Sequence, residues 1–367
     1  MAVFSKHPKY ESNFSRIVIL LYVFIFLNLF SCVYFREQSF YQCIRYSYLG
    51  FYIYTGYFIF RRINFSIPKV ERALFYLTIL FVICYLFQFL NPYYPLFISN
   101  EVAEGQFYSE DQQRFRLYGQ AIVSLGLFMG LNKYLCTKKL RHIILAAASL
   151  LCILLMGFRS LTLAAIISIF ILIYKIYGIN RRFIISSFGI GLLFVIFYNT
   201  SWGKNVISAM ESRQETQTLN NEDYIRMVSL NYHYTDFFHN TVEMILGSGE
   251  PASPRGNFKG SQYAKEIAVL QSQGFIYQDW GIIGYSWIRG IGTILCIIIC
   301  CFIGFFLKVN ARFYYLGIWL FFLLIGSITT AELFRPGAAF LVMFVLAILD
   351  KLNGIYERKN EISVGVS

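Results

Sequence analysis

The chain alternates between long apolar stretches and shorter polar connections. Ten stretches read as helices, and most approach the roughly 17–25 residues that cross a bilayer in helical form. They cover residues 17–35, 46–60, 73–90, 117–132, 142–157, 160–177, 183–199, 285–307, 313–330 and 337–350. Closed barrels also span membranes, but their sequences show short alternating strands rather than continuous apolar runs. The pattern therefore predicts an all-α integral membrane protein with about ten transmembrane helices.

The polar connections divide the chain into four regions. Seven predicted helices occupy residues 1–199, a large polar loop covers 200–284, three helices follow within 285–350, and a tail covers 351–367. In the large loop, tyrosine and phenylalanine recur at near-helical spacing from Asp223 to Leu246, which predicts one or two short helices. Glycine and proline residues between 247 and 254 then interrupt the helical pattern. A second, shorter loop covers residues 91–116.

Composition supports a membrane protein and excludes two other classes. Hydrophobic residues make up 57% of the chain, charged residues 14%, and the mean hydropathy is +0.54. A soluble domain carries about 25% charged residues, and a disordered chain needs low hydrophobicity. The first apolar run begins near Arg16 and is long enough to span, so it is interpreted as the first helix rather than a cleavable signal.

The net charge of +12 follows from the predicted topology. Alternate connections, together with both termini, hold 19 basic and 5 acidic residues, a net of +14, whereas all other segments net −2. This asymmetry predicts that both termini lie in the cytoplasm and that the large loop lies outside. It also accounts for the basic balance without any nucleic-acid partner.

The eight cysteines predict no disulfide framework. Only Cys43 lies in a segment predicted to be outside, and Cys136 lies in a basic loop. The other six lie in apolar runs: Cys32, Cys84, Cys152, Cys296, Cys300 and Cys301.

Three arginines on the predicted outer side are candidates for anion binding. Arg159 lies in a minimal turn between two apolar helices, where it either reaches a binding site or extends to the lipid headgroups. Arg335 lies in the last outward turn, where it either binds substrate or pairs with Glu332. Arg226 leads the expected helix of the large loop, following Tyr224. A guanidinium binds two phosphate oxygens at once and stays charged, so together these side chains suit a lipid-linked diphosphate.

Other polar residues of the outer side supply further candidates. Arg213, Arg255 and Arg289 also face outward, although nothing in their surroundings distinguishes them. His239 is the candidate general base, and His233 is a second histidine of the large loop. Glu332, Asp236 and Glu243 are alternative bases. The spacing of the two histidines is not that of a metal pair, so no metal or cofactor is predicted.

The order of the motifs resembles that of a known family. Gly157-Phe158-Arg159-Ser160 precedes a helix rich in small residues, Arg226 lies some twenty residues before Ile245-Leu246-Gly247-Ser248-Gly249, and Gly274-Phe275-Ile276-Tyr277 is followed by Trp280-Gly281-Ile282-Ile283-Gly284. With the topology, these features resemble the bacterial O-antigen and capsular polysaccharide polymerases, in the group that also contains the O-antigen ligases. The motifs cover residues 157–290.

The resemblance implies a GT-C-like, metal-independent, inverting glycosyltransferase of the bacterial inner membrane. Its substrates would be oligosaccharide repeat units on undecaprenyl diphosphate, in lipopolysaccharide or capsule biosynthesis, and the reaction would occur at the outer face. Arg159, Arg226 and Arg335 would bind the diphosphate, and His239 would act as the base. The remaining candidates, Arg213, Arg255, Arg289, Glu332, Tyr224 and His233, would contact substrate. Membrane lipid, a chain-length regulator and a flippase would be its partners.

One departure from the family affects the choice of reaction. Ligases of this group resemble each other in a histidine after the glycine-rich segment, whereas residues 256–284 contain none. This favours a polymerase over a ligase and leaves the base unassigned. A repeat-unit flippase is the third alternative, although no internal repeat of the kind common in transporters is evident.

Overall fold

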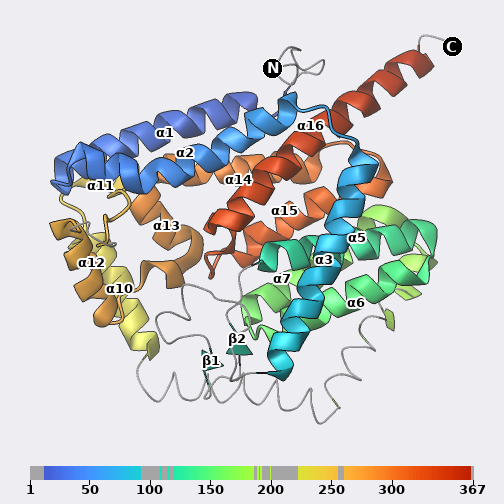
Figure 1. Ribbon diagram of the computed structural model, residues 1–367, viewed down its shortest axis with the longest axis horizontal. Coiled ribbons are helices and arrows are strands. Elements are labelled where there is room, and N and C mark those ends of the chain that lie inside the picture. Colours follow the sequence, from blue (N-terminus) through green and yellow to red (C-terminus); the bar gives the residue numbers. More distant parts are fainter. Residues whose placement is uncertain are drawn as a thin grey trace. The chain divides into compact units, whose positions relative to one another are not determined.

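The computed structural model describes residues 12–91, 108–109, 114–115, 119–185, 188–189, 191, 199, 222–254 and 260–364, with the backbone alone at 108–109, 114–115, 222–226 and 357–364. Almost all of this part of the chain is helical (Figure 1). It forms two compact units built from segments that are far apart in sequence. Unit 1 comprises Met1–Ile63, Gln217–Ile303 and Ser327–Lys351, and unit 2 comprises Asn64–Thr216, Gly304–Gly326 and Leu352–Ser367.

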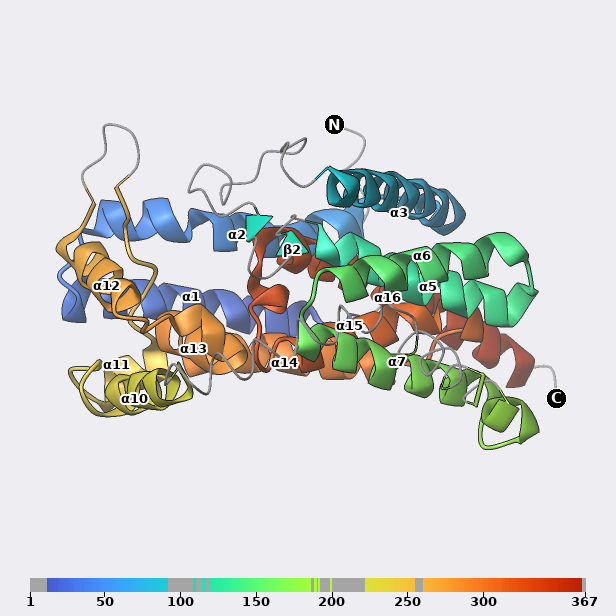
Figure 2. The ribbon, with the colours of Figure 1, turned by 90° about the horizontal axis from the view of Figure 1, so that it is seen from below.

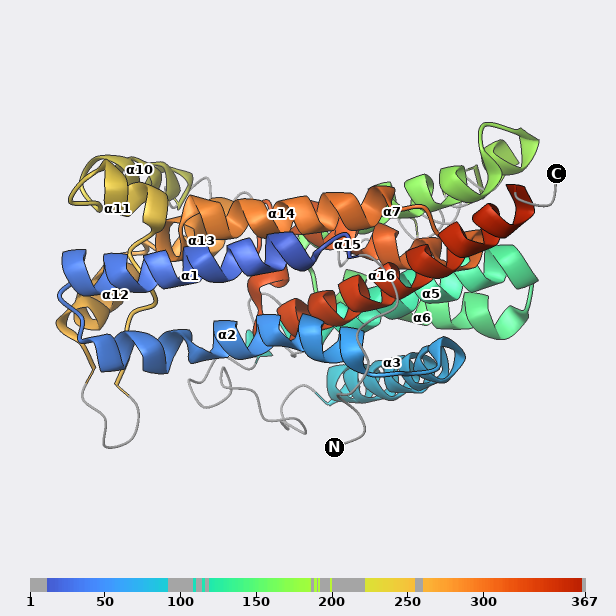
Figure 3. The same ribbon diagram turned by 90° about the horizontal axis from the view of Figure 1, so that it is seen from above.

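Unit 1 begins with a helical hairpin. Helices α1 (Ser15–Phe35) and α2 (Phe40–Arg62) lie side by side (Figure 3) and are joined by residues 36–39. The side chain of Ser39 accepts from the Gln42 backbone N–H, while the Gln42 side chain accepts from the Ser39 backbone N–H. This reciprocal capping box fixes the start of α2 and hence the hairpin turn.

Short helices complete unit 1. The other elements of unit 1 are α10 (Glu222–Thr235), α11 (Thr241–Leu246), α12 (Gln262–Ser272), the 3-10 turn η2 (Tyr277–Trp280), α13 (Gly281–Arg289), most of α14 (Ile291–Phe306), the 3-10 turn η4 (Glu332–Phe334) and the first part of α16 (Pro336–Val364). Figure 2 shows α10 to α13 gathered at one end of the α1–α2 hairpin. Helices α10 and α11 occupy the stretch from Asp223 to Leu246 that the sequence predicts to be helical. Buried side chains from the hairpin, α12, η2 and α13 form one cluster at this end.

Unit 2 packs around α5 (Gln120–Thr137), which is buried along most of its length. It contacts α3 (Ile67–Leu90), α6 (Leu140–Leu155), α7 (Arg159–Tyr177), the 3-10 turn η3 (Ala311–Phe313) and α15 (Tyr314–Gly326). Two glycines allow this close packing: a Cβ on Gly126 would lie 2.1 Å from a methyl group of Thr78, and one on Gly130 would lie 2.8 Å from the backbone oxygen of His142. The two-residue strands β1 (Tyr108–Ser109) and β2 (Arg114–Phe115) pair antiparallel.

The helices follow most of the predicted apolar stretches. The stretch 183–199 lies largely outside the described residues. The stretch 285–307 is predicted to be a single helix but forms two. Helix α13 ends at Arg289 and α14 begins at Ile291, because Gly290 between them has a φ of 84° and interrupts the helical conformation. Helix α16 also continues beyond the predicted end at residue 350 and reaches Val364.

Length and composition identify helices able to cross a membrane. Among the described residues four helices qualify, Ser15–Phe35, Ile67–Leu90, Arg159–Tyr177 and Pro336–Tyr356, and three apolar helices are shorter. Large apolar side chains also remain exposed on α3, where Leu80, Ile83 and Phe87 are each more than half accessible. A continuous exposed apolar face of this kind is expected where lipid covers the helix. The described residues are thus almost all helical, and their apolar helices are consistent with an all-α membrane protein.

Candidate functional site

The three arginines predicted to bind a diphosphate lie in different parts of the structure. Arg159 is exposed at the start of α7 in unit 2, directly after a turn at Gly157, whose φ is 70°. Arg335 belongs to unit 1, where its Nε lies 3.2 Å from Oε1 of Glu332. Arg226 lies in α10, at a position where the backbone alone is described. The gathering of these three arginines around one anion stays a prediction.

Of the other residues predicted to contact substrate, some are described in full and some are not. Arg213 and Arg255 fall outside the described residues, and at Tyr224 the backbone alone is described. Their predicted roles stay predictions. Arg289 and Glu332 are described in full, and both belong to unit 1.

Arg289 lines a cavity of about 170 Å³ in unit 1, here called the Arg289 cavity. Its Nε donates to Oε1 of Glu250 at 2.8 Å, and each side chain of the pair is 24% exposed. Apolar side chains such as Ile25 and polar ones such as Tyr46 and Asn28 form the rest of the wall. An ion pair that borders a cavity can exchange one partner, so an entering anion can replace the carboxylate on the guanidinium.

The glycine-rich segment Gly247–Gly249 positions this ion pair. The N–H groups of its last two residues donate to the last carbonyl groups of α13, each at 2.8 Å. This approach requires glycine, because a Cβ on Gly247 would lie 2.3 Å from the backbone N of Gly290. The segment therefore serves close backbone packing and delivers the next residue, Glu250, to Arg289.

A second guanidinium belongs to the same neighbourhood. The ring of Tyr285 stacks on Phe334, which lines the Arg289 cavity, with 4.6 Å between centroids. The guanidinium carbon of Arg289 lies 5.1 Å from the centre of the Tyr285 ring, and Tyr285 interacts electrostatically with both Arg289 and Arg335. Arg289 and Arg335 are thus each paired with a glutamate, and Arg335 lies in the chain between Phe334 and Pro336, which both line the cavity.

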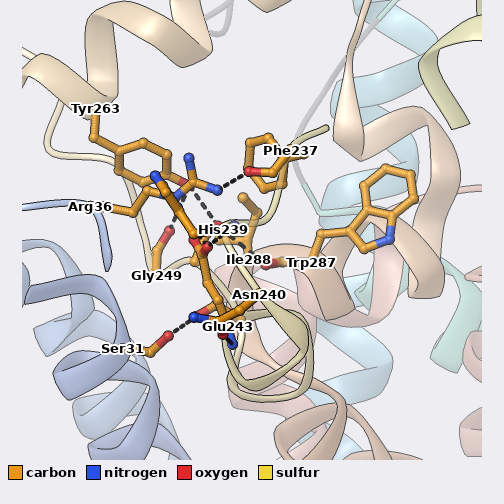
Figure 4. A network of polar contacts seen from close by, with 12 residues as sticks. Ser31, Arg36, Phe237, His239, Asn240, Glu243, Gly249, Tyr263, Trp287 and Ile288 are labelled. Carbon is orange, nitrogen blue, oxygen red and sulfur yellow. Dashed lines mark hydrogen bonds and ion pairs between the residues drawn. The ribbon is translucent and has the colours of Figure 1, made fainter. Parts of the chain in front are cut away.

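A buried carboxylate organises another polar site in unit 1 (Figure 4). Glu243 is fully buried, and its Oε1 accepts from Nε of Arg36 at 2.5 Å. Its Oε2 accepts from the backbone N–H of His239 at 2.8 Å and lies 2.9 Å from Nδ1 of the same residue. A carboxylate facing Nδ1 holds the proton on that nitrogen, which leaves Nε2 as the acceptor in the neutral ring. The His239 side chain is 57% exposed, so the imidazole is largely accessible to solvent.

Local structure explains why Glu243 and Arg36 can be buried. Asn240 caps α11 by accepting from the Glu243 backbone N–H at 3.0 Å, which places the carboxylate in the first turn of the helix. The Arg36 guanidinium lies over two aromatic rings, 4.3 Å from the centroid of Phe237 and 5.1 Å from that of Tyr263. Cation–π contacts and the carboxylate thus replace the water that the guanidinium loses.

His233 lies in a different environment from His239. It is 2% exposed and stacks on Trp287, with 4.1 Å between the ring centroids and an interplanar angle of 11°. Its Nδ1 donates to the backbone oxygen of Ser229 at 2.7 Å. Burial lowers the pKa of His233, and the nearby Arg36 acts in the same direction. This placement favours packing over the predicted contact with substrate.

Sequence reasoning missed the residues that hold these sites together. Arg36 and Glu250 were not among the candidates, and Glu243 was considered only as an alternative base. Glu250 has one local signal, since it directly follows the glycine-rich segment, and Arg289 has another, since it directly precedes the helix-breaking Gly290. No local pattern pairs Arg36 with a residue 207 positions away.

Comparisons with family models, curated proteins and solved structures give no match. The resemblance to polysaccharide polymerases therefore depends on the motifs of the chain alone. Among the described residues no group of three or more histidine, cysteine or acidic side chains is placed to hold a metal ion. The chemistry of the candidate sites is that of guanidinium groups, carboxylates and one exposed imidazole.

Proposed function

We propose that this protein is a membrane glycosyltransferase that polymerises lipid-linked oligosaccharide repeat units at the outer face of the bacterial inner membrane. The observation that carries the proposal is the Arg289 cavity, which is lined by Arg289 and by Phe334 and Pro336, the two neighbours of Arg335 in the chain. Such a site suits a diphosphate, because guanidinium groups bind its oxygens in pairs and neutralise its charge. The ten-span topology and the GT-C-like fold belong to the same proposal.

Contacts within unit 1 support the proposed orientation. Asp350 accepts hydrogen bonds from the Ser12 hydroxyl at 3.2 Å and from the Asn13 backbone N–H at 3.0 Å, and it lies 3.7 Å from Nε of Arg61. The positive-inside rule assigns all of these segments to the cytoplasmic side. If the helices alternate in direction across the membrane as proposed, these segments lie on the same side, as their contacts require.

Contacts between outward segments provide the matching support. Arg36, from the first outward turn, pairs with Glu243 of the large loop, and Arg289 pairs with Glu250 of the same loop. Each pair joins segments that the charge asymmetry assigns to the outer side. The candidate chemistry of unit 1 is accordingly proposed to face outward.

The proposed reaction uses the residues in distinct roles. The hydroxyl of an acceptor repeat unit attacks the anomeric carbon of the donor from the face opposite the diphosphate. The bond from that carbon to the diphosphate oxygen breaks, and the configuration inverts. Arg289 and Arg335 stabilise the negative charge that develops on the leaving diphosphate. His239, oriented by Glu243, accepts the proton of the attacking hydroxyl. Arg159 and Arg226 are further proposed contacts to the lipid diphosphate.

A paired substitution tests the role of Arg289. Replacing Arg289 alone leaves Glu250 as an unpaired, partly buried charge, so the informative variant is Arg289→Gln combined with Glu250→Gln. In vesicles supplied with one lipid-linked repeat unit, the wild type is expected to produce a ladder of glycans. The double variant is expected to lower the rate of chain extension by about 10²–10³-fold. Lys265→Gln, at an exposed position of α12, is the control and should leave the rate unchanged.

The same assay separates the alternatives. Full activity in the double variant would remove Arg289 from the proposed site. Transfer of the glycan to a different lipid acceptor, with no ladder from repeat units alone, would identify a ligase. Movement of labelled lipid-linked substrate across the vesicle membrane without formation of a glycosidic bond would identify a flippase.

A further inference from the structure

Two cysteines meet where the α1–α2 hairpin turns. Cys32 lies in the last turn of α1 and Cys43 in the first turn of α2, and each is 1% exposed. The two residues lie at facing ends of neighbouring helices, and their thiols interact with each other. Both belong to the buried cluster that also contains Tyr263 and Trp287. In the structure both are free thiols.

The segment that contains the glycine-rich motif covers this pair. Gly249 has a φ of 83°, and a Cβ at this position would lie 2.5 Å from Sγ of Cys32. On the other side, Nε2 of Gln38 donates to Sγ of Cys43 at 3.5 Å, and Oε1 of Gln38 accepts from the backbone N–H of Ala252 at 2.9 Å. Once this segment has docked, solvent reaches neither sulfur. Any chemistry at the pair therefore precedes docking.

The other cysteines lie in different surroundings. Cys136 lies in the last turn of α5, just before the basic residues Lys138 and Lys139 on the side proposed to face the cytoplasm, and Cys296, Cys300 and Cys301 lie within the apolar helix α14. Hydropathy predicts Cys32 to lie within an apolar run. Because α1 ends only three residues later, at Phe35, the cysteine lies at the outer end of its helix, beside Cys43.

We propose that Cys32 and Cys43 form a disulfide that closes the first outward hairpin before residues 247–254 cover it. The two thiols lose two protons and two electrons, one S–S bond forms, and a protein disulfide of the extracytoplasmic compartment accepts the electrons and becomes a dithiol. Exchange proceeds through a mixed disulfide with one of the two cysteines. Oxidising compartments maintain such bonds. The inference depends on the proposed orientation and not on the transferase reaction.

Thiol counting on the full-length protein tests the inference. Protein purified from membranes is denatured, its free thiols are blocked with a maleimide, and it is then reduced and labelled with a maleimide of high mass. Two of the eight cysteines are expected to label only after reduction. Peptide mapping without reduction should join the peptides that carry Cys32 and Cys43. Labelling of all eight before reduction would overturn the inference, as would a bond to any other cysteine or to a second chain.

Matched variants make the assignment specific. Cys32→Ser and Cys43→Ser should each abolish the reduction-dependent labelling, whereas Cys296→Ser should preserve it. A Ser272→Cys substitution in the Cys32→Ser, Cys43→Ser background reports the orientation of α12 to an impermeant maleimide added to intact cells. If the thiols of the wild type are free while residue 272 labels from outside, the disulfide is excluded and the proposed orientation stands. If residue 272 is protected in intact cells and labels only after lysis, the proposed orientation is excluded, and with it the disulfide that depends on that orientation. Chain extension is measured in a separate assay. Its loss or retention affects neither the thiol count nor the labelling of residue 272.

Discussion

Two buried glutamates show how the same group serves two purposes in this protein. In unit 2, Glu71 is 2% exposed and contacts Lys133 at 3.2 Å, Arg312 at 2.9 Å and the Tyr315 hydroxyl at 3.3 Å. In unit 1, Glu243 is fully buried and contacts one arginine and one histidine. Each carboxylate is satisfied by charged partners, as burial of a charge requires.

The two glutamates differ in the residues that contact them. The partners of Glu71 come from α5, η3 and α15, so its contacts join three elements of unit 2. Glu243 also joins two segments through Arg36, but its second oxygen holds His239, whose ring is mostly exposed. A carboxylate that orients an exposed imidazole can support proton transfer, whereas a carboxylate whose partners are a lysine, an arginine and a tyrosine has no neutral base to orient and stabilises the fold.

The largest effect on stability is expected from Glu71→Ala. The substitution leaves the cations at positions 133 and 312 without their carboxylate, and breaking a buried ion pair costs roughly 3–5 kcal/mol. Thermal unfolding in detergent should show a clear fall in the midpoint temperature. Glu37→Ala, at an exposed site in the hairpin turn, is the control and should change the midpoint little. An unchanged midpoint for Glu71→Ala would show that the cluster contributes no net stability.

Replacement of His239 should affect activity far more than stability. Because its ring is exposed, His239→Gln should leave the unfolding midpoint close to that of the wild type. Loss of a general base lowers a rate by about 10²–10⁴-fold, so glycan extension should fall by that amount. The matched control is Asp236→Asn, which removes an alternative base from the same turn and should retain activity. If Asp236→Asn lost activity and His239→Gln retained it, Asp236 and not His239 would be the base.

The approximate location of most described helices could be predicted from the sequence, because a helix that crosses a membrane requires a long apolar run. The break at Gly290 has only a weak local signal, the charged Arg289 before it, because the sequence around these two residues is largely apolar and glycine is common within membrane helices. The glycine-rich segment was visible as a motif, but its role depends on the α13 backbone against which it packs. Hydropathy alone placed Cys32 inside a span, whereas the end of α1 places it at the hairpin turn.

The candidate site was predictable only in its composition. Outward arginines and His239 were identified from charge asymmetry and residue type, both of which can be read locally. The pairing of Arg36 with Glu243 could not be, because the two residues meet only when the large loop docks on the first hairpin. Arg289 gains its importance from Glu250 and from the cavity, and both depend on packing between segments distant in sequence.

The smallest effect concerns His233, and it distinguishes a packed histidine from the exposed one. Burial holds the pKa of His233 below its usual value. In the unfolded chain the pKa of a histidine is about 6.5. Above that pH the ring is neutral in both states, so its contribution to stability is complete. As the pH falls below it, the unfolded state binds a proton that the folded state does not, and stability is lost. His233→Phe keeps a ring against Trp287 and cannot bind that proton. Unfolding midpoints measured from pH 8 to pH 5 should therefore fall less in the variant than in the wild type, and equal slopes would show that His233 is protonated in the folded protein.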